Sequence, residues 1–265
     1  MPFDILKLLR LKNRCKTGLA LSGGAARGMA HLGVARALYE KGIRPDAIAG
    51  TSAGAIVGAF LADGYEPDEL LEIIMGKRII KYLRLSFRNS GLLNMSGVRS
   101  IMEELFRAKN IEDLKIPLYI TCANLNSGEA EYFNKGELIE KLLATASIPG
   151  LFAPVKINGS LYADGGILDN LPVKPLQNKC KKIIGVDVNY TGPVDKIGNV
   201  KSVLERSFHL SIRAKIEAKA KQCDLFIDPD ELKGYSLTDI SRGREMFDIG
   251  YRKAKEMLAG SNEFN

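Results

Sequence analysis

Residues 17–62 read TGLALSGGAARGMAHLGVARALYEKGIRPDAIAGTSAGAIVGAFLA. The apolar run that begins at Thr17 is short and is followed by glycines, which predicts a buried strand, and residues 46–50 predict a second one. Each strand is followed by a run with mostly helical spacing, residues 26–41 and then residues 52–62. Two strands that alternate with two helices indicate a parallel sheet with helices packed against it.

The remainder of the chain continues this mixture of strands and helices. Helices are predicted at residues 67–76, 97–108, 137–146, 200–221 and 239–259, with a short helical turn at 172–177. Strands are predicted at 117–123, 129–133, 181–189 and 224–228, and residues 154–163 read as a hairpin that turns at Asn158-Gly159. Because no repeat, low-complexity segment or linker divides the chain, we expect a basic N-terminal segment, residues 1–16, followed by a single domain, residues 17–265.

Composition limits the class of protein. The 265 residues are 46% apolar and 26% charged, which is typical of a globular chain and excludes disordered, collagen-like and coiled-coil proteins. The sequence predicts neither a membrane-spanning helix nor a signal peptide, because it has no run of about 18 apolar residues and no cleavable hydrophobic leader. The four cysteines are far apart and form no C-x-x-C pair, so we expect reduced thiols in a cytosolic protein, without a zinc site or a disulfide framework.

The positive charge is local. The formal net charge is +7, while residues 1–16 carry +4 and residues 77–88 carry +5. In both segments the cations alternate with apolar residues. Two interpretations stay open: helices whose cations are merely solvated, or surfaces that contact an anionic membrane. Nucleic acid is not an expected partner, because no nucleic-acid-binding motif accompanies the charge.

Gly50-Thr51-Ser52-Ala53-Gly54 is a G-x-S-x-G motif between a predicted strand and a predicted helix. In this context the motif predicts a nucleophile elbow, with Ser52 on a tight turn and the flanking Gly50 and Gly54 avoiding collisions. The helix N-terminus beside Ser52 would also favour an alkoxide and a tetrahedral oxyanion. The alternative is a serine that only caps a helix.

A glycine-rich loop, Ser22-Gly23-Gly24-Ala25-Ala26-Arg27-Gly28, precedes the first helix. Backbone amides in such a turn converge on an anion. The glycine spacing does not fit a dinucleotide, and the Lys-Ser/Thr pair that a triphosphate requires is absent. An oxyanion is the third candidate, and it is favoured because the serine turn follows the next strand, at the same edge of a parallel sheet.

The sequence offers no convincing histidine base for Ser52. His31 lies near the apolar face of the first helix and reads as a packed residue, and His209 lies in a charged helix and reads as a surface residue. A carboxylate can serve instead if burial raises its pKa. The best candidate is Asp164 in Asp164-Gly165-Gly166, although an Asp-Gly-Gly can also be a simple turn. Asp169 is the rival, and we interpret it as a structural acid.

The motifs GGAARG, GTSAG and DGG, in this order and without a usable histidine, resemble those of the patatin-like phospholipase family. The similarity extends to ARGMAHLGVARALYEKGI, ASIPGLFAPV and DGGILDNLPV. It covers about residues 17–190 and is greatest to the small bacterial members of the family.

This resemblance implies a three-layer α/β/α fold with a mostly parallel sheet, and a metal- and cofactor-independent Ser–Asp acyl hydrolase. Its substrates would be phospholipids or lysophospholipids, cleaved through an acyl-enzyme. By position, Ser52 would be the nucleophile and Asp164 the general base. The oxyanion hole would be formed by amides around Gly23, Gly24 and Ala25, and supporting motif positions would be Arg27, Gly28, Gly50, Gly54, Gly165 and Gly166.

Ala25 departs from the family pattern, because many members have a third glycine there. If the position needs a positive φ, alanine is strained and the loop is slightly reshaped. Two alternatives therefore remain beside the phospholipase: a soluble acyl-ester or thioester hydrolase, and a catalytically weak lipid-binding or regulatory protein. The expected location is the cytoplasm, with peripheral contact at the inner face of an anionic membrane through residues 1–16 and 77–88.

Overall fold

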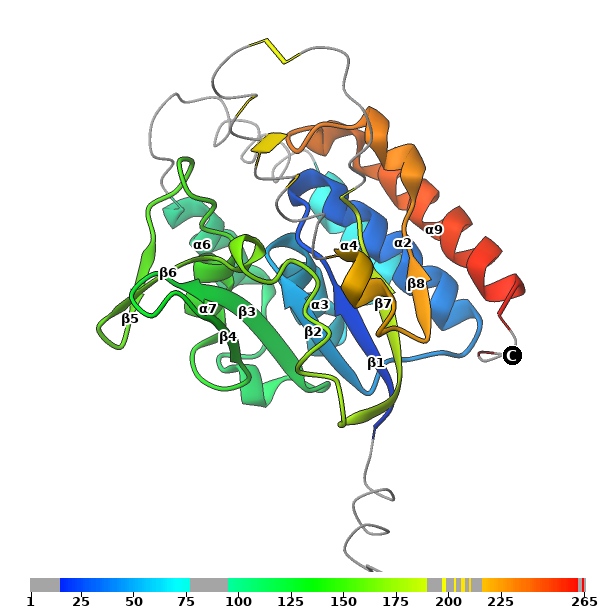
Figure 1. The fold of residues 1–265 in the computed structure, drawn as a ribbon, viewed down its shortest axis with the longest axis horizontal. Helices are drawn as coiled ribbons and strands as arrows, with labels where there is room; N and C mark the ends of the chain where they lie inside the picture. Colours follow the sequence, from blue (N-terminus) through cyan, green and yellow to red (C-terminus); the bar gives the residue numbers. More distant parts are fainter. Residues whose placement is uncertain are drawn as a thin grey trace, which may run out of the picture.

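A mixed sheet organises the part of the chain that the computed structural model describes, which is residues 15–76, 95–189, 216–261 and 264 together with a few isolated positions between 197 and 210. Its strands are β1 (Cys15–Leu21), β2 (Ala47–Thr51), β3 (Leu118–Asn124), β4 (Ala130–Phe133), β5 (Val155–Ile157), β6 (Ser160–Asp164), β7 (Cys180–Val186) and β8 (Leu225–Ile227). The strand order is β5-β6-β3-β2-β1-β7-β8, and β4 also pairs with β3 (Figure 1).

The helices follow the predicted order. They are α2 (Met29–Glu40), α3 (Ala53–Asp63), α4 (Pro67–Met75), α6 (Ser96–Leu105), α7 (Leu138–Thr145) and α9 (Gly243–Ala259). Short 3-10 turns occupy Ala25–Gly28, Ile111–Asp113, Gly165–Ile167, Asp230–Gly234 and Ile240–Arg242. In the described ranges, every helix is too short or too polar to cross a bilayer.

The central strands are parallel and their side chains alternate between two cores. Strands β3, β2, β1, β7 and β8 pair in parallel, and β4, β5 and β6 pair antiparallel. On β1, Leu19 and Leu21 belong to the large core under the helices, while Ala20 belongs to a smaller core on the opposite face. This period of two is what a strand buried on both faces requires.

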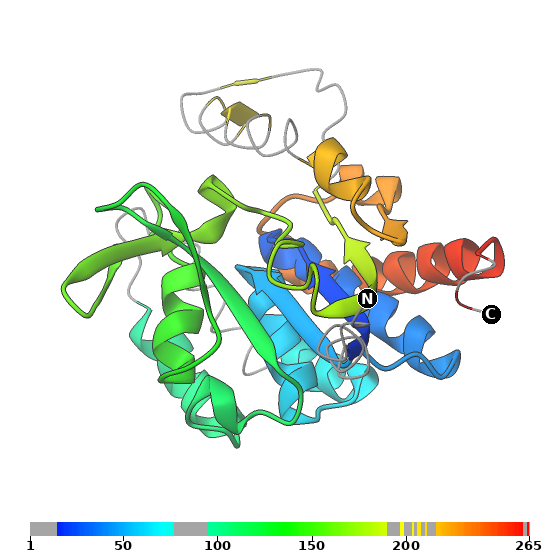
Figure 2. The same ribbon diagram turned by 60° about the horizontal axis from the view of Figure 1, so that its bottom comes forward.

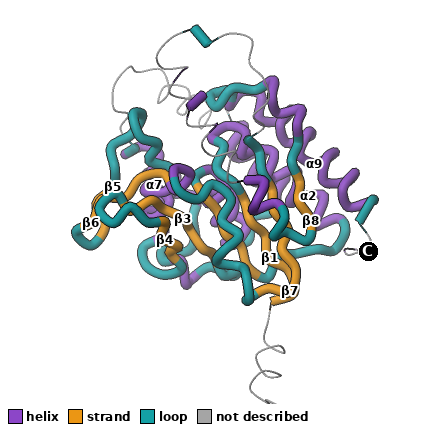
Figure 3. The backbone as a smooth tube through the Cα atoms, viewed as in Figure 1, coloured by secondary structure: helices purple, strands orange, loops and turns teal. Residues whose placement is uncertain are grey.

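The two faces of the sheet are covered unequally. Helices α2, α3, α4, α7 and α9 bury the large core on one face. The turns at 171–179 and the helical residues 216–220 cover the other face, and Figure 3 shows loop segments crossing in front of the strands while most helices lie behind them. The predicted three-layer α/β/α arrangement with a mostly parallel sheet is therefore confirmed, with one layer much thinner than the other.

Most predicted elements are present, with small shifts at their ends. The predicted helix 26–41 opens as a 3-10 turn, Ala25–Gly28, before the α-helix starts at Met29. The predicted hairpin turn has positive φ at both Asn158 (49°) and Gly159 (91°), as a type I′ turn needs. Residues 1–14, the basic segment 77–88 and His209 lie outside the described residues, as does most of the predicted helix 200–221.

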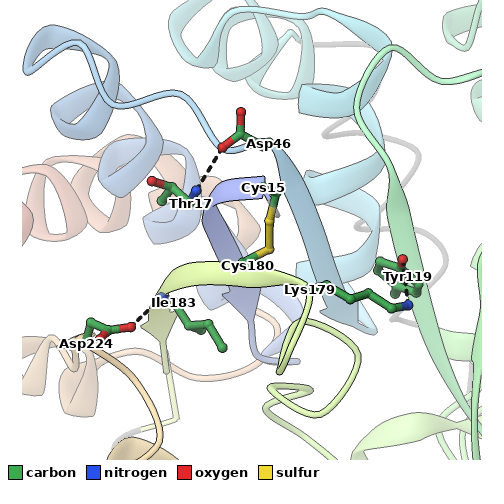
Figure 4. Close-up of a disulfide and its surroundings, with 8 residues drawn as sticks. All are labelled: Cys15, Thr17, Asp46, Tyr119, Lys179, Cys180, Ile183 and Asp224. Atoms are coloured by element: carbon green, nitrogen blue, oxygen red, sulfur yellow. Dashed lines mark hydrogen bonds between the residues drawn. A yellow bond between two sulfur atoms is a disulfide. The ribbon is translucent and has the colours of Figure 1, made fainter. Parts of the chain in front are cut away.

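The expectation that all four cysteines are reduced is wrong for one pair. Cys15 and Cys180 face each other across the parallel pair β1–β7, with their Cα atoms 4.5 Å apart, and they form a disulfide (Figure 4). They are 165 positions apart in the sequence, so only the sheet register brings them together. Cys15 and Lys16, which the sequence analysis assigned to the N-terminal segment, lie in β1. Cys122 and Cys223 are free thiols.

One edge of β3 brings two distant segments end to end. The β4 strand pairs with β3 from Ile120 to Ala123, so it occupies one side of that strand. On the other side, β2 pairs as far as Thr51 opposite Thr121, and β6 pairs from Asp164 opposite Cys122. Consecutive residues of β3 thus hold the last residue of β2 against the last residue of β6.

Helices α2 and α9 lie side by side at the outer surface of the large core (Figures 1 and 2). A Cβ atom on Gly33 of α2 would collide with the carbonyl oxygen of Phe247, and a Cβ on Gly250 of α9 would collide with the carbonyl oxygen of Ala30. The reciprocal glycines allow the two helix backbones to approach closely.

We expect Gly33→Ala to lower the free energy of unfolding by about 2–3 kcal/mol, because the added methyl group must push α9 away. Gly260→Ala is the matched control at the end of α9. Its Cβ would meet nothing closer than 3.8 Å, and its φ of −85° suits alanine, so a small gain of about 0.5 kcal/mol is expected. Urea unfolding measures both, and equal stability of the two variants would contradict the close packing.

Candidate active site

Ser52 lies on a sharp turn between β2 and α3. Its backbone has φ 52° and ψ −123°, a conformation that costs a non-glycine residue about 1–3 kcal/mol. The side chain is 6% exposed. A strained serine at a strand-to-helix junction is the geometry that the G-x-S-x-G motif predicts.

Close backbone contacts explain the glycines around Ser52. A Cβ atom on Gly54 would collide with the carbonyl groups of Leu21 and Ser22, and one on Gly50 would collide with the start of α3. The turn therefore packs directly against the end of β1.

Thr145, at the end of α7, supports the turn from the other side. Its hydroxyl accepts the Ser52 N–H at 2.9 Å and donates to the carbonyl of Thr121. Since no motif surrounds Thr145, the sequence analysis did not assign it a role.

Asp164 ends β6 directly beside Ser52. It is 3% exposed and accepts the Gly166 N–H at 2.8 Å, and the Ser52 side chain lies close enough to its carboxyl group to lower its pKa. Burial raises the pKa of Asp164 to about 6, and Ser52 and the Gly166 N–H partly oppose this effect. A Cβ atom on Gly165 would collide with the carbonyl of Thr121, so glycine is required for the chain to pass β3 here. The structure thus brings together the two residues that the motifs singled out.

The glycine-rich loop borders the serine, but its amides are not equivalent. The Gly23 N–H donates to the carbonyl of Asn170 at 3.2 Å. This amide is therefore already paired, although the sequence analysis expected it to form part of an oxyanion hole. The amides of Gly24 and Ala25 have no acceptor within the described residues. A Cβ placed on Gly23 would be 3.1 Å from the Cβ of Ser52. Of the three loop amides named in the sequence analysis, those of Gly24 and Ala25 are therefore the ones left unpaired among the described residues.

Ala25 has the positive φ that the sequence analysis considered for this position. Its φ is 47°, which costs an alanine about 1–2 kcal/mol relative to the right-handed region. The backbone at this position therefore has the left-handed conformation that a glycine would adopt without strain, and Ala25 adopts it at an energetic cost.

Arg27 and Gly28 hold the loop in place. The Arg27 guanidinium donates from Nε and Nη2 to the carbonyl of Tyr235, at 2.9 and 2.6 Å. Burial lowers the pKa of Arg27, and the negative charges of Asp187 and Asp239 oppose this. A Cβ on Gly28 would lie 2.8 Å from that of Ala53, so loop and elbow touch. These are structural contacts.

His31 is packed behind the same loop. It is fully buried, and its Nε2 lies 2.8 Å from the carbonyl oxygen of Ser22. Burial lowers the pKa of His31 to about 4, so the ring is neutral at pH 7 and Nε2 donates its proton to that carbonyl. His31 therefore braces the loop.

Asp169 makes the contacts of a structural acid. Its carboxylate accepts from the Tyr132 hydroxyl at 2.6 Å and pairs with Lys219, and its carbonyl accepts from the Thr51 hydroxyl at 2.8 Å. It ties β4, the end of β2 and the helical residues 216–220 together. In the described ranges, no group of three or more His, Cys, Asp or Glu residues could hold a metal ion.

Ser52 lines an apolar pocket of about 230 Å³. One wall is α3, another is α6, and the 3-10 turn of the glycine loop closes a third side. Among the described residues that line it, Ser52 is the only one with a polar side chain. The lining is Ala25, Ala26, Gly28, Met29, Ser52, Ala53, Ile56, Val57, Phe60, Ile74, Met95, Val98, Ile101, Met102, Leu105, Ala146, Ile148, Phe152 and Ile240.

The raised pKa of Asp164 predicts a pH-dependent stability. The folded protein keeps the Asp164 proton up to about pH 6, whereas the unfolded chain loses it near pH 3.8, so stability falls as the pH rises between these values. The shift corresponds to about 3 kcal/mol once Asp164 is ionised in both states. Asp164→Asn should therefore be more stable than wild type at pH 8, and this advantage should shrink below pH 6. Thermal unfolding from pH 4 to pH 8 measures it.

Asp169→Asn is the matched control, because it removes a buried carboxylate that is paired with Lys219. It should destabilise the protein at pH 8. An Asp164→Asn variant that is also destabilised at pH 8 would contradict the assignment of an unfavourable buried charge to Asp164.

Comparison with known proteins agrees with this geometry. The family model of patatin-like phospholipases matches residues 19–176. The chain is 30% identical over 304 aligned positions to Lysophospholipase NTE1 of Kluyveromyces lactis, an alignment that covers 99% of this chain and 20% of that protein. It is 35% identical over 179 positions to an uncharacterized NTE family protein of Mycobacterium bovis, covering 66% of this chain and 49% of that protein.

Among solved structures, the fold resembles that of VipD from Legionella pneumophila, with a TM-score of 0.52, 15% sequence identity, and coverage of 93% of this chain and 67% of that one. The chain spans only about a fifth of the yeast relative and about half of the mycobacterial one. Because the family match includes the glycine loop, the serine elbow and the Asp-Gly-Gly turn, the chain belongs to the patatin-like phospholipase family.

Proposed function

We propose that the protein is a serine acyl hydrolase that removes the fatty acyl group of a phospholipid or, preferentially, a lysophospholipid. Ser52 is the nucleophile and Asp164 the general base. The observation that carries the proposal is the placement of Ser52, which lines an apolar pocket, directly beside the buried Asp164 carboxyl group, whose pKa it lowers. The name of the Kluyveromyces lactis relative, a lysophospholipase, supports the same class of substrate.

The pocket supports a substrate with one acyl chain. It follows α3 from Ser52 to Phe60, which is about 12 Å at 1.5 Å per residue. Because the zigzag of an extended chain with bonds of about 1.5 Å advances only about 1.25 Å per carbon, this length holds about ten carbons. An apolar lining with a single reactive group at one end suits a fatty acyl ester whose polar headgroup remains outside.

In the first step, Asp164 accepts the proton of Ser52 as the serine oxygen attacks the ester carbonyl. A pKa near 6 leaves Asp164 mostly ionised at pH 7 to 8 while keeping it more basic than an exposed aspartate. The amides of Gly24 and Ala25 stabilise the oxyanion, and one such donor typically contributes about 3–4 kcal/mol.

When the first tetrahedral intermediate collapses, Asp164 returns the proton to the departing glycerol oxygen, and the acyl group stays on Ser52. Water then gives a proton to Asp164 as it attacks the acyl carbonyl, and that proton returns to Ser52 when the fatty acid leaves. One carboxylate therefore acts twice, as base and as acid, with no further group required.

The direct test combines active-site labelling with product analysis. A fluorophosphonate should label wild type at Ser52, leave Ser52→Ala unlabelled, and label Asp164→Asn at least about 100-fold more slowly, because the serine loses its base. Wild type should release fatty acid from lysophosphatidylcholine, with a rate that rises as Asp164 ionises around pH 6. Folded wild type that neither labels nor hydrolyses any lipid or short-chain ester would overturn the proposal.

Phe60 should set the acyl length that fits. Its ring stacks on Phe106 at 4.1 Å between centroids, and no residue of α3 beyond Phe60 lines the pocket. Phe60→Ala should shift the preferred ester towards chains longer by about two to four carbons, because the space of the ring becomes available. Leu61→Ala is the matched control, since Leu61 is buried on the same helix and does not line the pocket.

Initial rates on a series of lysophospholipids from six to eighteen acyl carbons measure the effect. The control should lose stability and keep the wild-type length profile. An unchanged profile in a folded Phe60→Ala variant would show that the acyl chain does not follow α3.

A further inference from the structure

We propose that Asn189 and Ser22 are positioning residues that aim the Gly24 amide at the oxyanion by holding the carbonyl group of Gly23 from behind. The inference rests on the proposed acyl-transfer function and adds to it two side chains to which the sequence analysis assigned no role.

The Gly23 carbonyl oxygen receives two side-chain donors. The Ser22 hydroxyl donates to it at 3.0 Å, and the Asn189 side-chain amide donates to it as well. Ser22 is fully buried and Asn189 is 5% exposed, so water does not compete with them. This carbonyl therefore has a fixed direction.

The direction of that carbonyl determines the direction of the next amide. A trans peptide is planar, so the C=O of Gly23 and the N–H of Gly24 belong to one rigid unit and point in opposite directions. With the oxygen bound to Ser22 and Asn189 on one side, the Gly24 N–H is presented on the other. That N–H has no acceptor in the described part of the chain, and the loop carrying it borders Ser52.

The two donors are themselves held by the residues that follow β7. The Ser22 hydroxyl accepts the Val188 N–H at 3.1 Å, and Asp187 Oδ1 accepts from both the backbone N–H and the side-chain amide of Asn189, at 3.3 and 3.2 Å. Asp187 is 3% exposed and attracts the Arg27 guanidinium. Arg27 thus contributes at a distance, by placing a positive charge near the carboxylate that orients Asn189.

Gly24 completes the arrangement because it has no side chain. A Cβ atom there would collide with a methyl group of Val188, so only glycine lets the loop lie against the segment that follows β7. The network has two donors on the Gly23 carbonyl and, at the other end of the same peptide, an amide that has no acceptor among the described residues. Because an oxyanion exists only in the transition state and the intermediate, the network should affect turnover and leave substrate binding in the apolar pocket unchanged.

Asn189→Ala is the main test, measured with a lysophospholipid of matched chain length. We expect kcat to fall by about 10- to 100-fold, somewhat less than for complete loss of an oxyanion donor, with KM changed less than about twofold. Ser22→Ala removes the second donor and should lower kcat by about 3- to 10-fold. It also serves as an independent test if Asn189→Ala folds poorly.

A binding measurement separates positioning from general damage. The affinity for a trifluoromethyl ketone analogue of the acyl chain, which forms a tetrahedral adduct, should fall in parallel with kcat/KM. The affinity for the fatty acid product, which only fills the pocket, should stay within about twofold of wild type.

Asn124→Ala is the matched control, because Asn124 is a buried asparagine whose side chain bonds Glu131, Tyr162 and its own turn. It should lower the melting temperature and leave kcat unchanged. If wild type is active and folded Asn189→Ala keeps its kcat, the positioning role is overturned while the proposed function stands. If wild type is neither labelled nor active, the proposed function is overturned, and the positioning role falls with it.

Discussion

The whole site depends on the register of β3. Thr121 pairs with the last residue of β2 and Cys122 with the last residue of β6, so two consecutive residues of one strand place Ser52 and Asp164 in contact. A shift of the register by one residue would turn one of these strand ends to the opposite face of the sheet. The strand is enclosed on its other edge by β4, and Thr145 binds the carbonyl of Thr121 at the point where the two strand ends meet. The contact is thus specified by backbone pairing, which is more rigid than a contact between two loops.

The site combines several unfavourable local states. Ser52 and Ala25 both have positive φ, and Asp164 is almost fully buried with a raised pKa. Together, these features cost about 5 to 8 kcal/mol by the usual magnitudes, which is comparable with the net stability of a small protein. They persist because the large core and the close contact of α2 with α9 stabilise the framework around them. A strained, partly dry site on a well-packed scaffold is what charge stabilisation without reorganisation requires.

The sequence predicts the framework well because its signals are local. The alternating strands and helices of residues 17–62, the type I′ turn at Asn158-Gly159 and the order of the three motifs all follow from short-range patterns, and all are present. The contacts of Thr145 and Asn189 could not be predicted, since Thr145 ends α7 and Asn189 follows β7, and each is brought to the site only by the tertiary fold. The same is true of the Cys15–Cys180 pair and of the Gly23 amide, whose acceptor, the carbonyl of Asn170, lies far along the chain.

Helix α3 has two duties that are physically linked. Its first residues form the turn that carries Ser52, and its next two turns form one wall of the apolar pocket. A substitution that tilts this helix would therefore change the shape of the pocket and the direction of Ser52, the proposed nucleophile, at once. Helix α6 forms the facing wall through Val98, Ile101, Met102 and Leu105, and it supplies none of the groups placed around the reacting carbonyl. Substrate preference can therefore change most easily through substitutions in α6. Such substitutions alter the shape of the pocket while Ser52 and Asp164 keep their positions.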